Sequence, residues 1–307
     1  MKKMAAGMLK SLLGKTWSAR LQSFMDAPRR DYVTERHLRH LSQAVARGAY
    51  ASLLSGELFH SALNRHEMRV FSQSGEDGIL LYLFSRIGSR DRRFIEFGVG
   101  DGRECNTANL ALNFGWSGLV MDGSASRMAS ARQYYDSELV DGASTVKTAQ
   151  AFVTAENADI LFRSHGFEGE LDLLSIDVDG NDYWIWKAIG SIRPRVVVVE
   201  YNAVFGPSAS VTIPYNSEFR WSASGFDLME AGASLTALTR LAAEKGYVLA
   251  GCNTDGVNAF FVRGDVASGV IEALTPERAY YPLRSRIHGL VLPVSESELS
   301  SRNLVRV

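Results

Sequence analysis

The sequence has 307 residues, and its 33 Lys and Arg nearly balance its 34 Asp and Glu, for a formal net charge of −1. A charge so close to zero argues against nucleic acid as the main partner. The 46% of hydrophobic residues is typical of a soluble globular protein, and no apolar run reaches the ~18 residues that a membrane-spanning helix needs. Cys105 and Cys252 are too few for a disulfide framework or a thiolate zinc site, which predicts a reducing, cytoplasmic location.

The charge is divided unevenly along the chain. Residues 1–70 carry 12 Lys and Arg against 5 Asp and Glu, whereas the remainder carries 21 against 29. We therefore expect a basic, helical N-terminal extension over residues 1–70, with an amphipathic helix in residues 1–21 and a second helix from about Asp31 to Leu63. The amphipathic helix would cap the body or meet another subunit of a homo-oligomer, and contact with an anionic membrane surface is the less favoured alternative.

From residue 71 onward, helical stretches alternate with short apolar runs. The predicted strands are Arg93–Phe97, Gly118–Met121, Thr145–Val153, Leu171–Ile176, Arg195–Val199, Tyr247–Gly251 and Asn258–Arg263. This alternation predicts an α/β fold with a mostly parallel sheet that helices cover on both faces. Residues 71–263 would form this domain, residues 203–233 an aromatic-rich loop that shapes an acceptor pocket, and residues 264–307 a C-terminal tail.

A glycine cluster follows the first predicted strand directly. Gly98, Gly100 and Gly102 allow a tight turn and a close approach of the backbone to a nucleotide-like ligand. A dinucleotide fingerprint would need a small residue at the position of Arg103, so the spacing argues against NAD or FAD.

This arrangement, an acid followed by G-x-G-x-G and a second acid at the end of the next strand, resembles the class I S-adenosylmethionine-dependent methyltransferases. The resemblance covers residues 71–263 and implies a Rossmann-like seven-stranded sheet whose last strand is antiparallel. The Ser72–Asp77 opening is similar to FkbM-type methyltransferases, which implies a cofactor contact or, alternatively, a simple helix start. The cofactor contacts implied by the resemblance are Gln73, Glu96, Gly98, Gly100, Gly102 and Asp122. For Asp122, which would hold the ribose hydroxyls, the alternative is a helix cap before Ser124.

Two further acids, Asp177 and Glu200, end the fourth and fifth predicted strands. Ligands of open α/β sheets bind at this edge, and carboxylate and amide oxygens suit Mg²⁺. The pattern resembles cation-dependent O-methyltransferases that act on catechols, caffeoyl esters and macrolide sugars. It implies Asp177, Glu200 and Asn202 as metal ligands, with Asp179 as an alternative third ligand. A turn in which Asp182 caps the next helix is the structural alternative.

The chain departs from that family at two positions. Tyr201 separates Glu200 from the asparagine, and Gly180 stands where the family has a lysine. A catalytic base would therefore come from Asp179, Asp182 or a histidine of a flanking segment, with Asp177 holding the cation.

Together these patterns predict an S-adenosylmethionine-dependent O-methyltransferase for a small-molecule or sugar hydroxyl, with or without Mg²⁺. The alternatives are metal-independent methylation at nitrogen and a non-catalytic binding protein built on the same fold.

Overall fold

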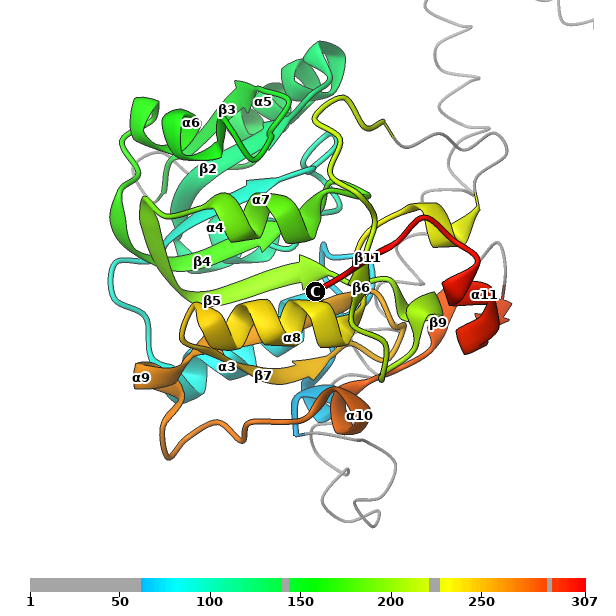
Figure 1. The fold of residues 1–307 in the computed structure, drawn as a ribbon. Coiled ribbons are helices and arrows are strands. Elements are labelled where there is room, and N and C mark those ends of the chain that lie inside the picture. The colour runs from blue at the N-terminus through cyan, green and yellow to red at the C-terminus, as the bar shows by residue number, and fades with distance from the viewer. Residues whose placement is uncertain (1–61, 140–143, 221–226, 286–288) are drawn as a thin grey trace, which may run out of the picture.

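A computed structural model describes residues 62–139, 144–220, 227–285 and 289–307 (Figure 1). The amphipathic helix expected in residues 1–21, and nearly all of the helix expected from Asp31 to Leu63, lie outside the described residues. No helix in the described ranges is both long and apolar enough to cross a membrane.

The centre of the structure is a seven-stranded sheet with the order β3-β2-β1-β4-β5-β8-β7. Its strands are β1 (Arg93–Phe97), β2 (Ser117–Asp122), β3 (Val146–Gln150), β4 (Gly169–Ile176), β5 (Ile192–Glu200), β7 (Tyr247–Cys252) and β8 (Asn258–Arg263). The first five are parallel, and β8 runs antiparallel between β5 and β7. This confirms the mostly parallel Rossmann-like sheet with an antiparallel last strand, and it brings the carboxyl ends of β1 to β5 to one edge.

Helices cover both faces of the sheet, as Figure 1 shows. The helices are α3 (Glu76–Ile87), α4 (Ala108–Phe114) and α5 (Ala125–Glu138) on one face, and α6 (Ala158–Ser164), α7 (Asp182–Ala188) and α8 (Leu235–Glu244) on the other. Strand residues alternate between the two cores: Val196 and Val198 join the α3 face, whereas Val197 and Val199 join the α8 face. Burial on both faces explains why these strands are continuous apolar runs in the sequence.

The long segment after β5 and the C-terminal tail pack together. The segment contains η3 (Ala203–Phe205), β6 (Val211–Thr212) and η4 (Leu228–Glu230), and the tail contains α9 (Gly264–Ala267), α10 (Pro276–Ala279), β9 (Leu283–Ser285), β10 (Gly289–Val291), α11 (Glu296–Ser300) and β11 (Val305–Arg306). β11 pairs antiparallel with β6, and Phe205, Val211 and Leu299 form a small apolar cluster between the two parts. The expected loop is therefore anchored by regular structure at its base.

The chain just before α3, which includes η2 (Leu63–His66), packs against the turn between β7 and β8. The Asn64 amide donates to the Cys252 carbonyl, and the Glu67 carboxylate accepts from the Thr254 backbone and hydroxyl. This contact fixes the segment that leads into α3, which forms one wall of the site described below.

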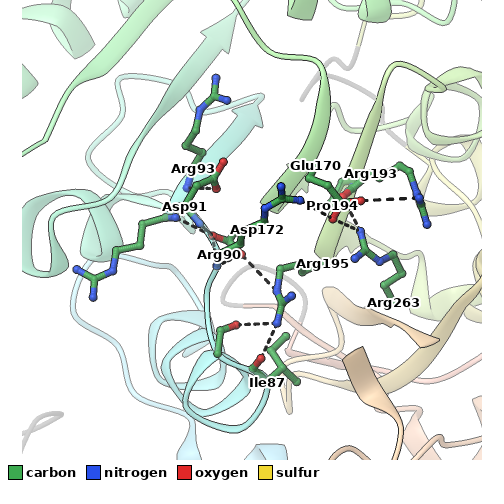
Figure 2. Close-up of polar contacts among 12 residues, drawn as sticks. Ile87, Arg90, Asp91, Arg93, Glu170, Asp172, Arg193, Pro194, Arg195 and Arg263 are labelled. Atoms are coloured by element: carbon green, nitrogen blue, oxygen red, sulfur yellow. Dashed lines mark hydrogen bonds and ion pairs between the residues drawn. The ribbon is translucent and has the colours of Figure 1, made fainter. Parts of the chain in front are cut away.

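Polar contacts at the opposite edge of the sheet fasten the strand beginnings (Figure 2). The buried Asp172 carboxylate accepts backbone N–H groups of the turn before β1, including that of Arg92 at 2.7 Å, and pairs with Arg195 at 3.4 Å. Arg263 binds Glu170 at 2.9 Å and so joins the end of β8 to β4. These charged side chains form ion pairs and hydrogen bonds within the fold, and they lie away from the carboxyl edge of the sheet.

Candidate active site

A cavity of about 1330 Å³ opens at the carboxyl edge of the sheet. The glycine loop after β1, the segment before α3 and the ends of β4 and β5 line it. The sequence-predicted residues in its wall are Gln73, Glu96, Gly98, Gly100, Asp177, Asp179 and Glu200. Gly102, Asp122, Asp182 and Asn202 do not line it, so the predicted site separates into cavity residues and supporting residues.

The three glycines of the loop have positive φ angles, 85° at Gly98, 59° at Gly100 and 75° at Gly102, but different surroundings. A β-carbon at Gly98 would overlap the backbone carbonyl of Asp177, whereas one at Gly100 would meet nothing within 4 Å. At Gly102 it would lie 2.9 Å from the Tyr135 ring. Gly100 is thus the glycine with open space for a ligand. Gly102 packs against α5, so its contact with the cofactor stays a prediction that this geometry does not support.

Glu96 lies in the cavity wall but is almost fully buried. Its carboxylate accepts four hydrogen bonds: the backbone N–H groups of Asn106 and Thr107, each at 2.9 Å, the Thr107 hydroxyl at 2.6 Å and the Ser175 hydroxyl at 3.1 Å. Four donors fill the acceptor capacity of a carboxylate. The arrangement therefore favours positioning of the glycine loop over a direct ion pair between Glu96 and the cofactor.

Asp122 ends β2, as predicted, and its carboxylate turns toward the glycine loop. It accepts the Gly100 N–H at 3.0 Å and the Ser124 N–H at 2.7 Å, and Arg127 lies 3.9 Å away. The capping alternative is present in part, because Asp122 holds the start of the turn into α5 while the Ser124 hydroxyl caps that helix. The hydrogen bond to Gly100 also ties Asp122 to the one open position of the loop.

A cluster of three carboxylates lies at the floor of the cavity. Oxygens of Asp177, Asp179 and Glu200 all lie within 4.8 Å of one another. Burial, and then the charges of the neighbouring carboxylates, raise the pKa of both Asp177 and Glu200 well above their usual range. Carboxylates brought this close either share protons or share a cation. The geometry thus selects Asp179, the alternative third ligand, to complete the predicted metal set.

The side chain of Asn202 is bound by backbone groups of its own loop, so this geometry does not support it as a metal ligand, and that role stays a prediction. Its amide nitrogen donates to the Leu228 and Ala231 carbonyls, and its amide oxygen accepts the Val204 N–H at 3.0 Å. Asn202 therefore caps η3 and ties it to η4. The intervening Tyr201 lengthens the spacing, and the Asn202 side chain, held by local backbone partners, does not line the large cavity.

Asp182 is likewise a supporting residue that does not line the large cavity, so its role as a catalytic base stays a prediction without support from this geometry. It is buried at the start of α7, where its carboxylate accepts the N–H groups of Val178 and Gly180, both at 2.9 Å. Burial raises the pKa of Asp182 to about 6. Its carboxylate is directed back into the turn that carries Asp179. It does not cap α7, because Asn181 is the N-cap of that helix and no side chain caps it.

Asn258, in the cavity wall, was not predicted from the sequence. Asn258 lies directly opposite Glu200 in the β5–β8 pairing, so the two side chains share one face of the sheet. The Asn258 amide nitrogen donates to Glu76 at 2.8 Å, whereas its amide oxygen is buried without a partner among the described residues. An unpaired buried acceptor in a ligand-sized cavity indicates a place where a bound group completes the hydrogen bonding or coordination. The pairing of β8 with β5 is the only signal for this residue.

A second, smaller cavity of about 100 Å³ lies on the other side of the carboxylates. Asp179 and Glu200 line both cavities, and the rest of the small one is mainly apolar, including Ala203, Leu228 and Leu283. The two acids therefore stand between a large polar cavity and a small apolar one. A group in either cavity can reach the same oxygens.

Comparison with known proteins gives matches by structure only: no family profile and no curated protein matches the sequence. The structure is similar to a putative caffeoyl-CoA O-methyltransferase from Staphylococcus aureus, with 12% identity over 77% of this chain and 99% of that one and a TM-score of 0.44. An O-methyltransferase from Bacillus cereus in complex with SAH shows 16% identity, coverage of 73% and 89%, and a TM-score of 0.40. An S-adenosylmethionine-dependent methyltransferase from Clostridium acetobutylicum shows 9% identity, coverage of 70% and 96%, and a TM-score of 0.40.

Proposed function

We propose that this protein is an S-adenosylmethionine-dependent O-methyltransferase that acts on a small-molecule or sugar hydroxyl with the help of Mg²⁺. The observation that carries the proposal is the meeting of two features in one cavity, the glycine loop after β1 and the cluster of Asp177, Asp179 and Glu200. A metal-independent methyltransferase would need the first feature alone.

The cavity fits the cofactor in size and in chemistry. A volume of about 1330 Å³ accommodates a nucleoside joined to an amino acid. The wall offers backbone at Gly100, the side chain of Gln73 and a surplus of oxygen acceptors, which suits a ligand that carries positive charge. When bound, S-adenosylmethionine supplies a methyl group on a cationic sulfur. The residues that would hold it are Gln73, Gly98 and Gly100, with Asp122 fixing the loop.

The carboxylate cluster fits a hard divalent cation. Asp177, Asp179 and Glu200 supply anionic oxygens, and the unpaired Asn258 amide oxygen lies on the same face of the sheet beside Glu200. Mg²⁺ prefers such oxygen ligands and keeps open positions for water or a substrate hydroxyl. A cation held here would lower the pKa of an acceptor hydroxyl, and would remove the repulsion that now raises the pKa of the acids.

The carboxylates of the cluster would have different roles in the reaction. Glu200 and Asp179 reach the small apolar cavity, which would receive the acceptor, whereas Asp177 faces the large cavity only. Of the three predicted catalytic carboxylates, Asp179 is the most exposed, and partial desolvation raises its pKa. It is therefore also placed to take the proton of the acceptor hydroxyl. Exclusion of water and orientation of the two reactants would supply most of the rate.

Calorimetric titration with Mg²⁺ and a methyl-transfer assay test this proposal together. Wild type should bind Mg²⁺, and Asp177→Asn and Glu200→Gln should each weaken binding at least tenfold, about 1.4 kcal/mol. Asp136→Asn, which removes an exposed acid of α5, is the matched control and should bind as wild type does. If a labelled methyl group is transferred to an acceptor at the full rate in the presence of a chelator, the proposal is wrong and the methylation does not depend on a metal.

A further inference from the structure

The segment over residues 213–219, which follows β6 (Figure 1), packs against the turn that carries Asp179 and against the start of α7. The Trp184 indole donates to the Ile213 carbonyl at 2.9 Å. The Asn181 amide donates to the Asn216 carbonyl at 2.7 Å. Two contacts so close to the turn make the segment part of the support of the carboxylate cluster, although it contributes no residue to either cavity.

The third contact is the packing of the Phe219 ring on Gly180. Gly180 is buried, and a β-carbon at this position would overlap the Phe219 ring. Its backbone does not require glycine, since the positive φ angle belongs to the preceding residue. Gly180 is therefore explained by the close approach of Phe219, and the absence of a side chain there lets the segment dock.

The position of the Asp179 carboxylate depends on the backbone of this turn. Asp179 is one of the two non-glycine residues with positive φ among the described residues, at 58°, a conformation that surrounding contacts must maintain. Within the described chain, no hydrogen bond holds its side chain in place. On one side of the turn, the Asp182 carboxylate accepts the N–H groups of Val178 and Gly180. On the other side, Phe219 packs on Gly180, and the Asn216 carbonyl accepts the amide of the adjacent Asn181.

We propose that Phe219 is a positioning residue for Asp179, so that docking of the 213–219 segment and cation binding at the carboxylate cluster favour each other. The inference rests on the cation site of the proposed function. Because coupling between two events is reciprocal, a bound cation must also stabilise the docked segment.

The test uses Mn²⁺ as the probe and the full-length protein. Calorimetry should show that Phe219→Ala weakens Mn²⁺ binding about fivefold or more, whereas Phe219→Leu, which retains an apolar contact, stays within about twofold of wild type. Phe114→Ala, which removes an equally large but half-exposed ring on α4, is the matched control and should leave binding unchanged.

Gly180→Ala separates steric contact from simple loss of stability. Alone, it should weaken Mn²⁺ binding several-fold because the new methyl group meets the ring. In a Phe219→Ala background the same change should matter less than twofold, since the obstacle has gone. Equal effects of Gly180→Ala in both backgrounds would overturn the proposal.

Amide hydrogen exchange of wild type gives a readout that needs no variant to fold. Mn²⁺ should slow exchange over residues 213–219, and unchanged exchange at saturating Mn²⁺ would overturn the coupling, as would wild-type affinity in Phe219→Ala. Failure of wild type itself to bind Mn²⁺ would refute the cation site of the proposed function, and this inference with it. That outcome is read from the wild-type titration alone, so the two failures are distinguishable.

Discussion

The carbonyl oxygen of Asp177 occupies the space that a side chain on Gly98 would need. The contact holds the glycine loop after β1 against the end of β4, and so fixes the glycine-loop side of the cavity relative to the carboxylate cluster.

Gly98→Ala should destabilise the protein by about 3 kcal/mol or more, because a positive φ angle is strained for alanine and the overlapping atom belongs to the backbone. Gly100→Ala has the same sign of φ but meets no atom within 4 Å, so it should cost about 1 kcal/mol. Urea denaturation of both variants provides the measurement. Equal losses would show that steric contact with Asp177 is not what requires glycine at position 98.

Glu96→Gln should lower stability by about 1–3 kcal/mol, because an amide nitrogen would replace one acceptor among four converging donors. The same variant should weaken S-adenosylmethionine binding through the loosened loop. Thermal unfolding and a calorimetric titration measure the two effects. A large loss of affinity with unchanged stability would instead indicate that Glu96 forms a direct ion pair with the cofactor.

Asp179→Asn and Asp182→Asn should behave in opposite ways. Asp179 has a raised pKa and no hydrogen bond from a described residue to its side chain, so its neutral replacement should weaken Mg²⁺ binding and leave stability equal or higher. Asp182→Asn removes an acceptor from the backbone of the turn and should cost about 1–3 kcal/mol of stability. Denaturation curves combined with Mg²⁺ titrations separate the two. The assignment fails if Asp182→Asn is fully stable yet unable to bind the cation.

Asp77 should make stability fall as pH rises between about 4 and 6. Burial raises its pKa to about 6, although three backbone N–H groups bind one of its oxygens; the unfolded value is about 3.9. The folded state therefore binds more protons than the unfolded state in this window, so the free energy of unfolding declines by up to about 2–3 kcal/mol. Comparing urea denaturation of wild type and Asp77→Asn from pH 4 to 7 isolates this contribution. A difference independent of pH would contradict it.

The sheet was predictable from the sequence because its signals are local. Each buried parallel strand is a short apolar run, and Arg93–Phe97 and Asn258–Arg263 match the structure at both ends. The acids at strand ends, Asp177 and Glu200, follow from the same pattern and do meet at the carboxyl edge.

The direction of side chains in the loops was not predictable in this way. Asn202 and Asp182 stand at plausible sequence positions, but nearby backbone groups bind their side chains, and neither residue lines the large cavity. Asn258 enters the site only because β8 inserts beside β5, and Phe219 supports Asp179 only because a distant segment returns to the turn. These relationships arise from tertiary structure, which spacing along the chain does not encode.

Calorimetric titration of the folded, full-length protein with S-adenosylmethionine tests the central claim most directly. The account predicts saturable binding of one cofactor per chain in the cavity beside Gly100, weakened by Asp122→Ala through loss of its hydrogen bond to the Gly100 N–H. Absence of binding at millimolar S-adenosylmethionine, by protein whose circular dichroism shows it to be folded, would contradict the methyltransferase assignment.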